Sequence, residues 1–416
     1  MSDQTLWRNG NFLRLWGAQA ISLLGSQITL LALPIVALIT LDASIFQMGM
    51  LAAAATLPAP ILGLLAGVWT DRLRRRPILI GADLGRALAL AVIPFALWSD
   101  VLSMALLYGV SLVTGILGVW FNVAHRSLLP SLVRREQLVD ANGKLETSYS
   151  GAFIVGPGLA GLLIQFVTAP VAIIVDAISY LASALLLTRI KPEVERPNAD
   201  VARRGVWAEA REGLLAVRDN PILMSMAMSL SAFNLFLSML NALLVLYAVR
   251  DLGIDPAGLG VIFAVGSAGF PIGAAAANVV AKRIGVGRAI IWGAVVSDLA
   301  LLLIPLAGVV PGGAIPLLIA SRFITMLTGP VTAINQLSLR QSITPDNVLG
   351  RTNATMMVLS LGLAPIGGVL AGLLGELFGV QSTILAAAIG VQLGFVILLL
   401  SPIRSLDTPL IAKARG

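Results

Sequence analysis

The residues of this chain that could do chemistry are a few charged side chains inside long apolar stretches. They are Asp83, Arg86, Asp176, Asp298 and Arg322. A charge in such a place is costly in a lipid bilayer unless it is paired or faces water, so it marks a site for protons, ions or a polar ligand. The absence of cysteine excludes thiol catalysis, and a single histidine, His125, leaves no histidine-based metal cluster.

The composition places these stretches in a membrane. Hydrophobic residues make up 57% and charged residues 12% of the 416 residues, far from the values of a soluble chain. The net charge of +7 comes from basic residues in short runs between apolar blocks. We therefore expect these runs to lie at a bilayer surface and not on nucleic acid. The first apolar run is too long for a signal-peptide core, so we expect it to be retained.

The elements that position the charged residues are twelve predicted membrane-spanning helices, each of about 20 mostly apolar residues. They are Leu15–Thr40, Met48–Thr70, Ile78–Trp98, Leu102–Ala124, Thr147–Thr168, Pro170–Leu187, Ile222–Tyr247, Ala257–Ala281, Ala289–Leu306, Ile315–Gln336, Thr352–Phe378 and Val380–Leu400. Alternate threading puts all of the 28 lysines and arginines except Arg86, Arg250 and Arg322 on one side. By the positive-inside rule that side, with both termini, is cytoplasmic.

The domain organisation follows from the longest polar segment. We expect a six-helix bundle at 1–187, a cytoplasmic linker at 188–220, a second bundle at 221–401 and a cytoplasmic tail at 402–416. Within the linker, apolar residues recur at helical spacing beside charged ones. The apolar residues are Trp207, Ala210, Leu214 and Val217, and the charged ones are Glu209, Arg211, Glu212 and Arg218. This pattern predicts an amphipathic helix on the membrane surface.

The two bundles carry an internal repeat. Arg283 lies 211 positions after Arg72, and the same spacing relates Asn9 to Asn220 and the "AGLL" at Ala160 to its second copy. One constant register across six helices indicates duplication of a six-helix unit. Two such units joined by a long cytoplasmic loop are typical of transporters, whose substrate site lies near mid-membrane between the halves.

Polar side chains form stripes on four of the spans, and such stripes would line a water-filled substrate cavity. The stripes lie on the first, fourth, seventh and tenth spans. Their members are Gln19, Ser22, Ser26 and Thr29; Ser111, Thr114 and Asn122; Ser231, Asn234, Ser238 and Asn241; and Arg322, Thr325, Thr332 and Gln336. Serine and threonine also bond to their own helix backbone, which is the alternative interpretation of each.

A family resemblance rests on "GVWTDRLRRRP", residues 67–77. The stretch resembles the loop signature of the major facilitator superfamily, although Arg74 stands where the family favours glycine. Further segments look like the drug:proton antiporter branch with macrolide-efflux and enterobactin-exporter-like proteins. They include "ADLGRAL", "HRSLLPSLVRREQLVDANG", "GPGLAG", "VDAISYLASALLL" and "GRTNATMM". The resemblance implies an all-α integral membrane fold of twelve helices in two pseudo-symmetric six-helix bundles, the major facilitator fold, whose members line their cavity with the same four spans.

The resemblance also implies a conformational gate at the cytoplasmic face. Asp71 would meet the start of the eleventh span, around Gly350 to Asn353. Asp83 and Arg86, three residues apart on one helix face, would form a network with Arg126, or else a static pair that only fixes helix packing. The expected gate residues are Gly67, Asp71, Arg72, Arg75, Arg76, Asp83, Arg86, Arg126 and Arg351.

Two further expectations concern export and coupling. Gly156, Pro157 and Gly161 match an antiporter signature, although small-residue helix packing explains them equally. Arg322 occupies the position equivalent to Ser111, so the intramembrane arginine that many antiporters carry on the fourth span would have moved to the tenth. The possible coupling residues are Arg322, Asp298 and Asp176, with packing or capping as the alternative for the two acids. No acid lies on the four striped spans, which favours neutral, amphipathic or anionic cargo.

These observations predict a secondary-active, proton-coupled exporter of small amphipathic molecules, drug-like, antibiotic-like or siderophore-like, that works by alternating access. The alternatives are an uptake permease or facilitator, and a transport-inactive receptor or scaffold. The sequence contains no phosphate-binding loop of the kind that an ATP-driven pump needs. It also contains no cluster of acids or histidines and no nucleophile with its base, as an enzyme would need. We expect no cofactor, a proton gradient as the energy source, and a small molecule, protons and the lipid bilayer as partners. We also expect a monomer in the inner cell membrane.

Overall fold

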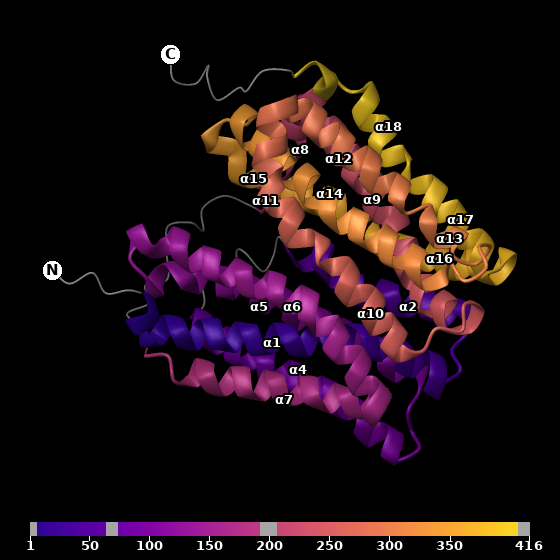
Figure 1. The fold of residues 1–416 in the computed structure, drawn as a ribbon. Helices are drawn as coiled ribbons and strands as arrows, with labels where there is room; N and C mark the ends of the chain where they lie inside the picture. The colour runs from indigo at the N-terminus through magenta and orange to yellow at the C-terminus, as the bar shows by residue number, and fades with distance from the viewer. Residues whose placement is uncertain (1–5, 64–73, 192–205, 407–416) are drawn as a thin grey trace. The chain divides into compact units, whose positions relative to one another are not determined.

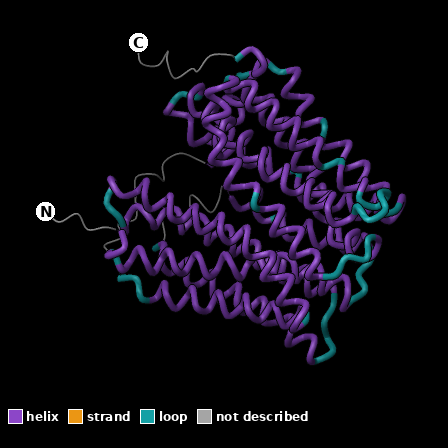
Figure 2. Tube along the Cα trace, viewed as in Figure 1, coloured by secondary structure: helices purple, strands orange, loops and turns teal. Residues whose placement is uncertain are grey.

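The fold is all-helical throughout the part of the chain that the structure describes (Figure 2). The structure is a computed structural model that describes residues 6–63, 74–191 and 206–406, with the backbone alone at 206–210, 346 and 347. These residues contain twelve helices long and apolar enough to cross a membrane. The predicted count of twelve spans in an all-α membrane fold is therefore confirmed.

Contacts within the chain divide it into two units. The first contains Met1–Ala43 and Ala54–Arg203, and the second contains Ser44–Ala53 and Arg204–Gly416. The helices of the first half of the chain are α1 (Gly10–Ile35), α2 (Ile45–Thr56), α4 (Arg75–Trp98), α5 (Met104–Leu132), α6 (Leu138–Val167) and α7 (Ala169–Thr188), with short 3₁₀ turns at Leu6–Arg8 and Arg135–Gln137 (Figure 1).

The second half of the chain begins with the short helix α8 (Val206–Arg218), and several of its spans are broken into two helices. The others are α9 (Pro221–Leu246), α10 (Pro256–Ser267), α11 (Gly269–Ile284), α12 (Val286–Ala300), α13 (Leu303–Leu306), α14 (Ala314–Ile343), α15 (Asp346–Gly362), α16 (Ala364–Phe378), α17 (Val380–Val391) and α18 (Leu393–Leu400), before a 3₁₀ turn at Pro402–Ser405 (Figure 1). Each break leaves one or two residues outside the helices, so the paired helices continue one span.

The internal repeat of the sequence is also visible in the backbone structure of the helix ends. Asn9 caps the start of α1 and Asn220 caps the start of α9, each through a side-chain oxygen that accepts two peptide N–H groups. Both helices end in a five-residue π-turn, Val36–Thr40 after α1 and Tyr247–Asp251 after α9, again 211 positions apart. The caps and the π-turns thus recur at the spacing of the sequence repeat.

Several helices extend beyond the predicted spans at their polar ends. The fourth span was predicted to end at Ala124, but α5 continues to Leu132; the fifth was predicted to start at Thr147, but α6 begins at Leu138. Hydropathy marks only the apolar part of a helix, whereas the backbone hydrogen bonds continue through polar residues beyond it. The described part of the second predicted span stops at Gly63.

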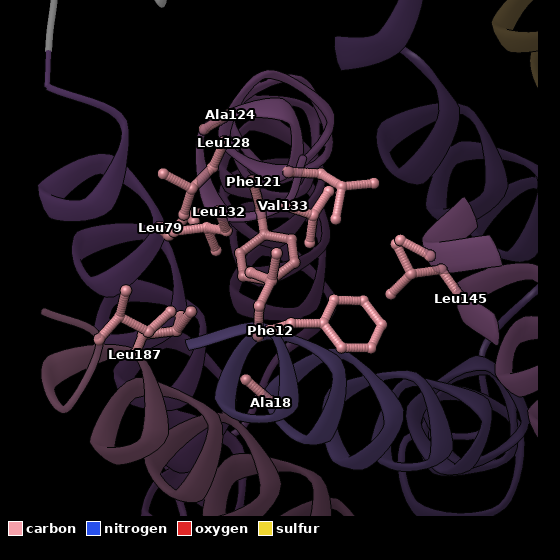
Figure 3. Packing of buried hydrophobic residues seen from close by; sticks show 14 of the residues in the cluster. Phe12, Ala18, Leu79, Phe121, Ala124, Leu128, Leu132, Val133, Leu145 and Leu187 are labelled. Carbon is pink, nitrogen blue, oxygen red and sulfur yellow. The ribbon is translucent and has the colours of Figure 1, made fainter. Parts of the chain in front are cut away.

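The core of the first unit lies where α1, α4, α5 and α6 meet near the chain's N-terminal segment. Phe12 of α1, Leu79 of α4 and Phe121 of α5 belong to one cluster of buried side chains (Figure 3). Leu145 of α6 and Leu187 of α7 belong to the same cluster. The cluster fixes the ends of these helices and thereby the register of the polar residues further along them.

The predicted linker helix is present as α8, and its buried side faces α15 and α9. Val217 is fully buried with Leu223 and Met226 of α9, whereas Leu214 is exposed. A β-carbon at Gly213 would lie 2.6 Å from the carbonyl oxygen of Arg351, so this residue lets α8 lie directly on α15. α8 is thus docked on its own unit through one small residue and one apolar residue.

Candidate functional site

The polar residues that the structure gathers most closely lie where α7 packs against both α1 and α4 (Figure 1). On α7, Asp176, Ser179, Tyr180 and Ser183 follow one another at spacings of three, one and three, which puts them on one helix face. Asp83 and Arg86 face them from α4, and Ser26 and Thr29 face them from α1. We call these eight residues the α7 seam.

Asp83 and Arg86 form the pair that their spacing predicts. Arg86 Nη2 donates to Asp83 Oδ1, and the Ser183 hydroxyl donates to Asp83 Oδ2 at 2.6 Å. Asp83 is fully buried and Arg86 is 6% exposed. Because a buried ion pair needs further hydrogen bonds to offset its lost hydration, the contact with Ser183 completes the partners of this carboxylate.

Arg86 also contacts two aromatic rings. Its guanidinium carbon is 4.4 Å from the ring centroid of Phe121 on α5 and 4.2 Å from that of Tyr180 on α7. Arg126, the expected third member of the network, is exposed, and no contact with Asp83 or Arg86 is found among the described side chains. The reason is helical: Phe121 and His125 occupy the inner face of α5 and stack on each other, which turns Arg126 away.

Asp176 occupies a second pocket of the α7 seam, against α1. The Thr29 hydroxyl donates to Oδ2 of Asp176, and the Ser179 hydroxyl donates to Oδ1 at 3.0 Å. Gly25 of α1 lies directly over this carboxylate, because a β-carbon there would collide with Asp176 Oδ1 and Ser179 Oγ. Ser26 and Tyr180 share a hydrogen bond of 2.9 Å beside it. The carboxylate thus has hydroxyl partners and no cation in direct contact among the described residues.

The polar stripe of α1 divides between two surroundings. Ser26 and Thr29 turn to α7, as above, and Ser26 also donates to the Ser22 carbonyl of its own helix at 2.8 Å. Gln19 is half-buried, and its Oε1 has no hydrogen-bond partner among the described atoms. On α5, Thr114 donates to the backbone of its own helix and Asn122 is exposed. The buried Ser111 hydroxyl has no partner within the described part of the chain.

The stripe of α9 is held mainly by backbone carbonyl groups of the second unit. Ser231 donates to the Leu359 carbonyl at 2.8 Å, and Ser238 donates to the Ala364 carbonyl at 2.6 Å. Asn234 donates to Leu230 of its own helix, and Asn241 is exposed. Two of the four predicted cavity residues therefore fasten α9 to α15 and α16.

The stripe of α14 contains the intramembrane arginine. Thr325 donates to the Ser297 carbonyl and Thr332 to the Ile290 carbonyl of α12, each at 3.4 Å, and Gln336 is buried. The guanidinium of Arg322 lies 4.5 Å from the ring centroid of Phe263 on α10, and its Nε has no partner among the residues that the structure describes. Its side chain crosses Gly266, where a β-carbon would collide with it.

Asp298, the other candidate acid, sits on α12 at 2% exposure. The peptide N–H of Phe395 donates to its carboxylate, and Gln392 Nε2 donates to its carbonyl oxygen at 2.8 Å. A β-carbon at Gly394 would lie 3.2 Å from the carboxylate. Asp298 thus fastens α12 to the start of α18, the packing role that was the alternative interpretation.

The expected gate residues are only partly described. Gly67, Asp71 and Arg72 lie outside the described residues. Arg76 donates from Nε to the Leu187 carbonyl at 3.0 Å and from Nη2 to the Thr188 carbonyl, so it caps the end of α7. Arg75 begins α4 beside it. Arg74, the departure from the family's glycine, has φ of −68°, an ordinary extended backbone that carries no left-handed strain.

Arg351, at the start of the eleventh span, pairs with Glu212 of α8. The sequence expectation linked this part of α15 to Asp71, whereas the described partner comes from the linker helix. Gly156 of the antiporter-like segment packs on α1, where its β-carbon would lie 2.5 Å from Gln27 Cγ, and Pro157 and Gly161 are buried in α6. Close packing of α6 on α1 is thus visible at this motif.

Several side-chain partners were not predicted from the sequence. Ser179, Tyr180 and Ser183 complete the α7 seam, Phe263 lies against Arg322, and Glu212 pairs with Arg351. The spacing of polar residues along the sixth span was the available signal for the first three. Among the described residues, no group of three or more His, Cys, Asp or Glu side chains could hold a metal ion.

Comparison with protein families matches residues 2–415 to the family described as transmembrane secretion effector. The multidrug efflux pump Tap of Mycolicibacterium fortuitum is 28% identical over 404 residues, covering 92% of this chain and 94% of that protein. Macrolide efflux protein A of Streptococcus pyogenes is 24% identical over 401 residues, covering 95% of this chain and 97% of that protein.

Solved structures resemble the fold over nearly the whole chain. The nucleoside transporter NupG superposes with a TM-score of 0.76 at 14% identity, covering 94% of this chain and 98% of that one. A bacterial homologue of the iron transporter ferroportin in its inward-facing state gives a TM-score of 0.75 at 16% identity, covering 95% and 99%. At these identities the likeness concerns the fold alone.

Proposed function

The chain belongs to the transmembrane secretion effector family of the major facilitator superfamily, and on this premise we propose that it is a proton-coupled exporter of small amphipathic molecules. The family and the relatives are transporters, so the chain is a multi-pass membrane transporter and not an enzyme. The relatives' names, multidrug efflux pump and macrolide efflux protein, support outward transport of drug-like compounds.

One structural observation carries the proposal of a substrate site. Ser111 and Arg322 occupy equivalent positions in the two copies of the repeat, and each has a buried polar atom without a protein partner among the described residues. A buried polar atom is costly to leave unpaired, so such atoms persist where a ligand or water completes their bonds. Arg322 is a fixed donor because Phe263 supports its guanidinium, which suits hydrogen-bond acceptors on an amphipathic substrate.

The remaining parts of the proposal concern energy and placement. A proton gradient would drive export by alternating access without a bound cofactor. The excess of basic residues on one side of the threaded chain supports placing both termini in the cytoplasm, with the protein in the cell membrane, surrounded by lipid and acting as a monomer. The same rule supports a cytoplasmic position for the charged linker between the two units.

Everted membrane vesicles that contain the full-length protein provide the test. Energised vesicles should accumulate ethidium or radiolabelled erythromycin several-fold above vesicles without the protein. An agent that collapses the pH difference should abolish the accumulation. Uptake that is equally fast without a pH difference would show that the protein is a facilitator and not a proton-coupled exporter. Absence of flux for every probe would favour a receptor or scaffold.

The matched control variants distinguish loss of the substrate site from loss of protein expression. Arg322→Ala should abolish accumulation at unchanged expression, because it removes the buried donor. Arg283→Ala, at an exposed position of the same unit, should leave accumulation unchanged. Equal accumulation by Arg322→Ala and the wild type would remove Arg322 from the substrate site.

A further inference from the structure

We propose that the Asp176 carboxyl group in the α7 seam is the proton-binding site of this transporter, an inference that rests on the proposed proton coupling. The residues that carry it are the two buried acids, the arginine that pairs with Asp83, and the hydroxyls that reach Asp176 from α1 and α7.

The first argument is a count of charges. Asp83 and Asp176 are both fully buried, and Arg86 is the one basic side chain of the eight residues that make up the α7 seam. With both acids ionised, the seam would hold a net negative charge away from water, which is strongly unfavourable. Uptake of one proton makes the seam neutral. Because Arg86 and Ser183 already bond to Asp83, the proton belongs on Asp176.

The second argument is that the partners of Asp176 tolerate both of its forms. Thr29 and Ser179 offer hydroxyl groups, which donate to an ionised carboxylate and can rotate to accept from a protonated one. A lysine or arginine in contact would instead hold the group permanently ionised. A site that must bind and release a proton in each cycle needs partners of the first kind.

Few other charged or titratable groups face Asp176. From α4 the facing groups are Arg86 and Asp83, and from its own helix Tyr180. On α1 the only charged side chain is Arg14, near the helix start, where it donates to the Arg189 carbonyl. The charged or titratable side chains of α6 are Asp140, Lys144, Glu146 and Tyr149. They lie near the start of α6, at the far end of the α6–α7 pair from Asp176, because α7 follows α6 directly through Thr168.

The third argument is that the fold does not require an acid at the position of Asp176. At the 211-residue spacing, Asp83 corresponds to Ala294, Asp176 to Ala387 and Tyr180 to Val391. These three residues of the second unit are buried and apolar. Thr29 and Ser183 likewise correspond to Leu240 and Gly394. The second unit thus has apolar residues at the counterparts of Asp83, Asp176 and Tyr180 and holds its own buried acid, Asp298, at the contact of α12 with α18. Since the repeat packs without an acid at the position of Asp176, this carboxyl group serves something besides packing.

The fourth argument connects Asp176 to the stripe on α1. Ser26 and Thr29 are part of that stripe, are only half-buried, and bond to Tyr180 and Asp176 respectively. A proton can therefore reach Asp176 through hydroxyls that also belong to the predicted substrate surface. Gly25 brings the α1 backbone against the carboxylate, so a change of charge on Asp176 acts directly on this helix.

Infrared difference spectra of the purified full-length protein in lipid nanodiscs test proton binding without any substrate. The wild type should show a protonated-carboxyl band that disappears as the pH is raised and shifts in D₂O. Asp176→Asn should lose this band and Asp298→Asn should keep it, whereas Asp83→Asn, which leaves the Arg86 charge to balance Asp176, should move the loss of the band to lower pH. Thr29→Val should change the pH at which the band titrates, and Ser183→Ala, a partner of Asp83, should not. A band unchanged in Asp176→Asn overturns the inference.

Ethidium transport by the same variants in proteoliposomes separates this inference from the proposed function. Asp176→Asn should lose gradient-driven accumulation completely and retain downhill ethidium exchange within a few-fold of the wild type. Accumulation by Asp176→Asn equal to wild type would overturn the inference and leave proton coupling standing. Absence of proton-driven accumulation in the wild type would overturn the coupling itself. If Asp176→Asn is not recovered as a monodisperse protein, the infrared titration of Thr29→Val tests the inference, and a band that titrates at the wild-type pH in this variant overturns it.

Discussion

The guanidinium of Arg86 on α4 lies over the ring of Tyr180 on α7, with 4.2 Å between the guanidinium carbon and the ring centroid. The second aromatic neighbour is Phe121 of α5, and the charge itself is paired with Asp83. One side chain therefore joins three helices of the first unit by cation–π contacts and an ion pair. Arginine suits this position because its planar group stacks and pairs at the same time.

Replacing Arg86 by alanine should strongly destabilise the first unit. The change leaves the Asp83 carboxylate buried without its counter-charge, a loss that typically costs about 3–5 kcal/mol. The measurement is the temperature at which half of the purified protein remains monodisperse in detergent. Lys144→Ala is the control, since its pair with the exposed Asp140 is worth at most about 1 kcal/mol. Equal shifts in the two variants would show that the buried pair contributes no more than a surface pair.

Gly25→Ala should disrupt the contact of α1 with α7. The added methyl group would collide with Asp176 Oδ1 and Ser179 Oγ, so α1 must move or these side chains must leave their positions. We expect reduced thermal stability and loss of transport in the vesicle assay. Gly17→Ala on the same helix is the matched control, because its methyl group would meet only Leu186 Cδ1 at an ordinary 3.5 Å. A Gly25→Ala protein as stable and active as the control would show that the close approach is dispensable.

The helices were predictable from the sequence because a bilayer leaves few alternatives to an apolar helix of about twenty residues. The Asp83–Arg86 pair was predictable for a similarly local reason, since residues three apart share a helix face. The matching caps at Asn9 and Asn220 follow from residue type and register alone.

The surroundings of the α1 stripe were not predictable in the same way. Periodicity shows that Ser26 and Thr29 share a face, but not how far the helix is rotated toward its neighbours. In the structure that rotation is set by Gly25, which permits α1 to lie on α7 and turns both hydroxyls to Tyr180 and Asp176. The same limit explains why the α9 hydroxyls Ser231 and Ser238 were assigned to a cavity although they bond to backbone carbonyl groups.

Gly213→Leu should release α8 from α15. A β-carbon at this position would collide with Thr355 Oγ1 and lie 2.6 Å from the Arg351 carbonyl oxygen, so a larger side chain cannot be accommodated while the helices touch. We expect faster cleavage of the 188–220 segment in limited proteolysis. Glu212→Ala should have a smaller effect, because Glu212 is half exposed and its ion pair with Arg351 is worth at most about 1 kcal/mol. An unchanged rate of cleavage in Gly213→Leu would show that the contact of α8 with α15 does not protect this segment from the protease.

Replacing Phe263 should weaken substrate binding at Arg322 while the charge of Arg322 is retained. The ring lies 4.5 Å from the guanidinium and keeps it in place across Gly266, so Phe263→Leu removes the π-face while retaining much of the apolar volume. A cation–π contact of this kind is worth about 0.5–2 kcal/mol, which corresponds to a change of roughly two- to thirty-fold in an equilibrium constant. We expect the half-saturating concentration of erythromycin in everted vesicles to rise within that range, with a maximal rate close to wild type, because a less fixed donor weakens binding. The conservative Phe263→Tyr, which keeps the ring, should restore the wild-type value. A Phe263→Leu protein whose maximal rate falls at an unchanged half-saturating concentration would contradict a binding role and assign the Phe263–Arg322 contact to a later step of transport.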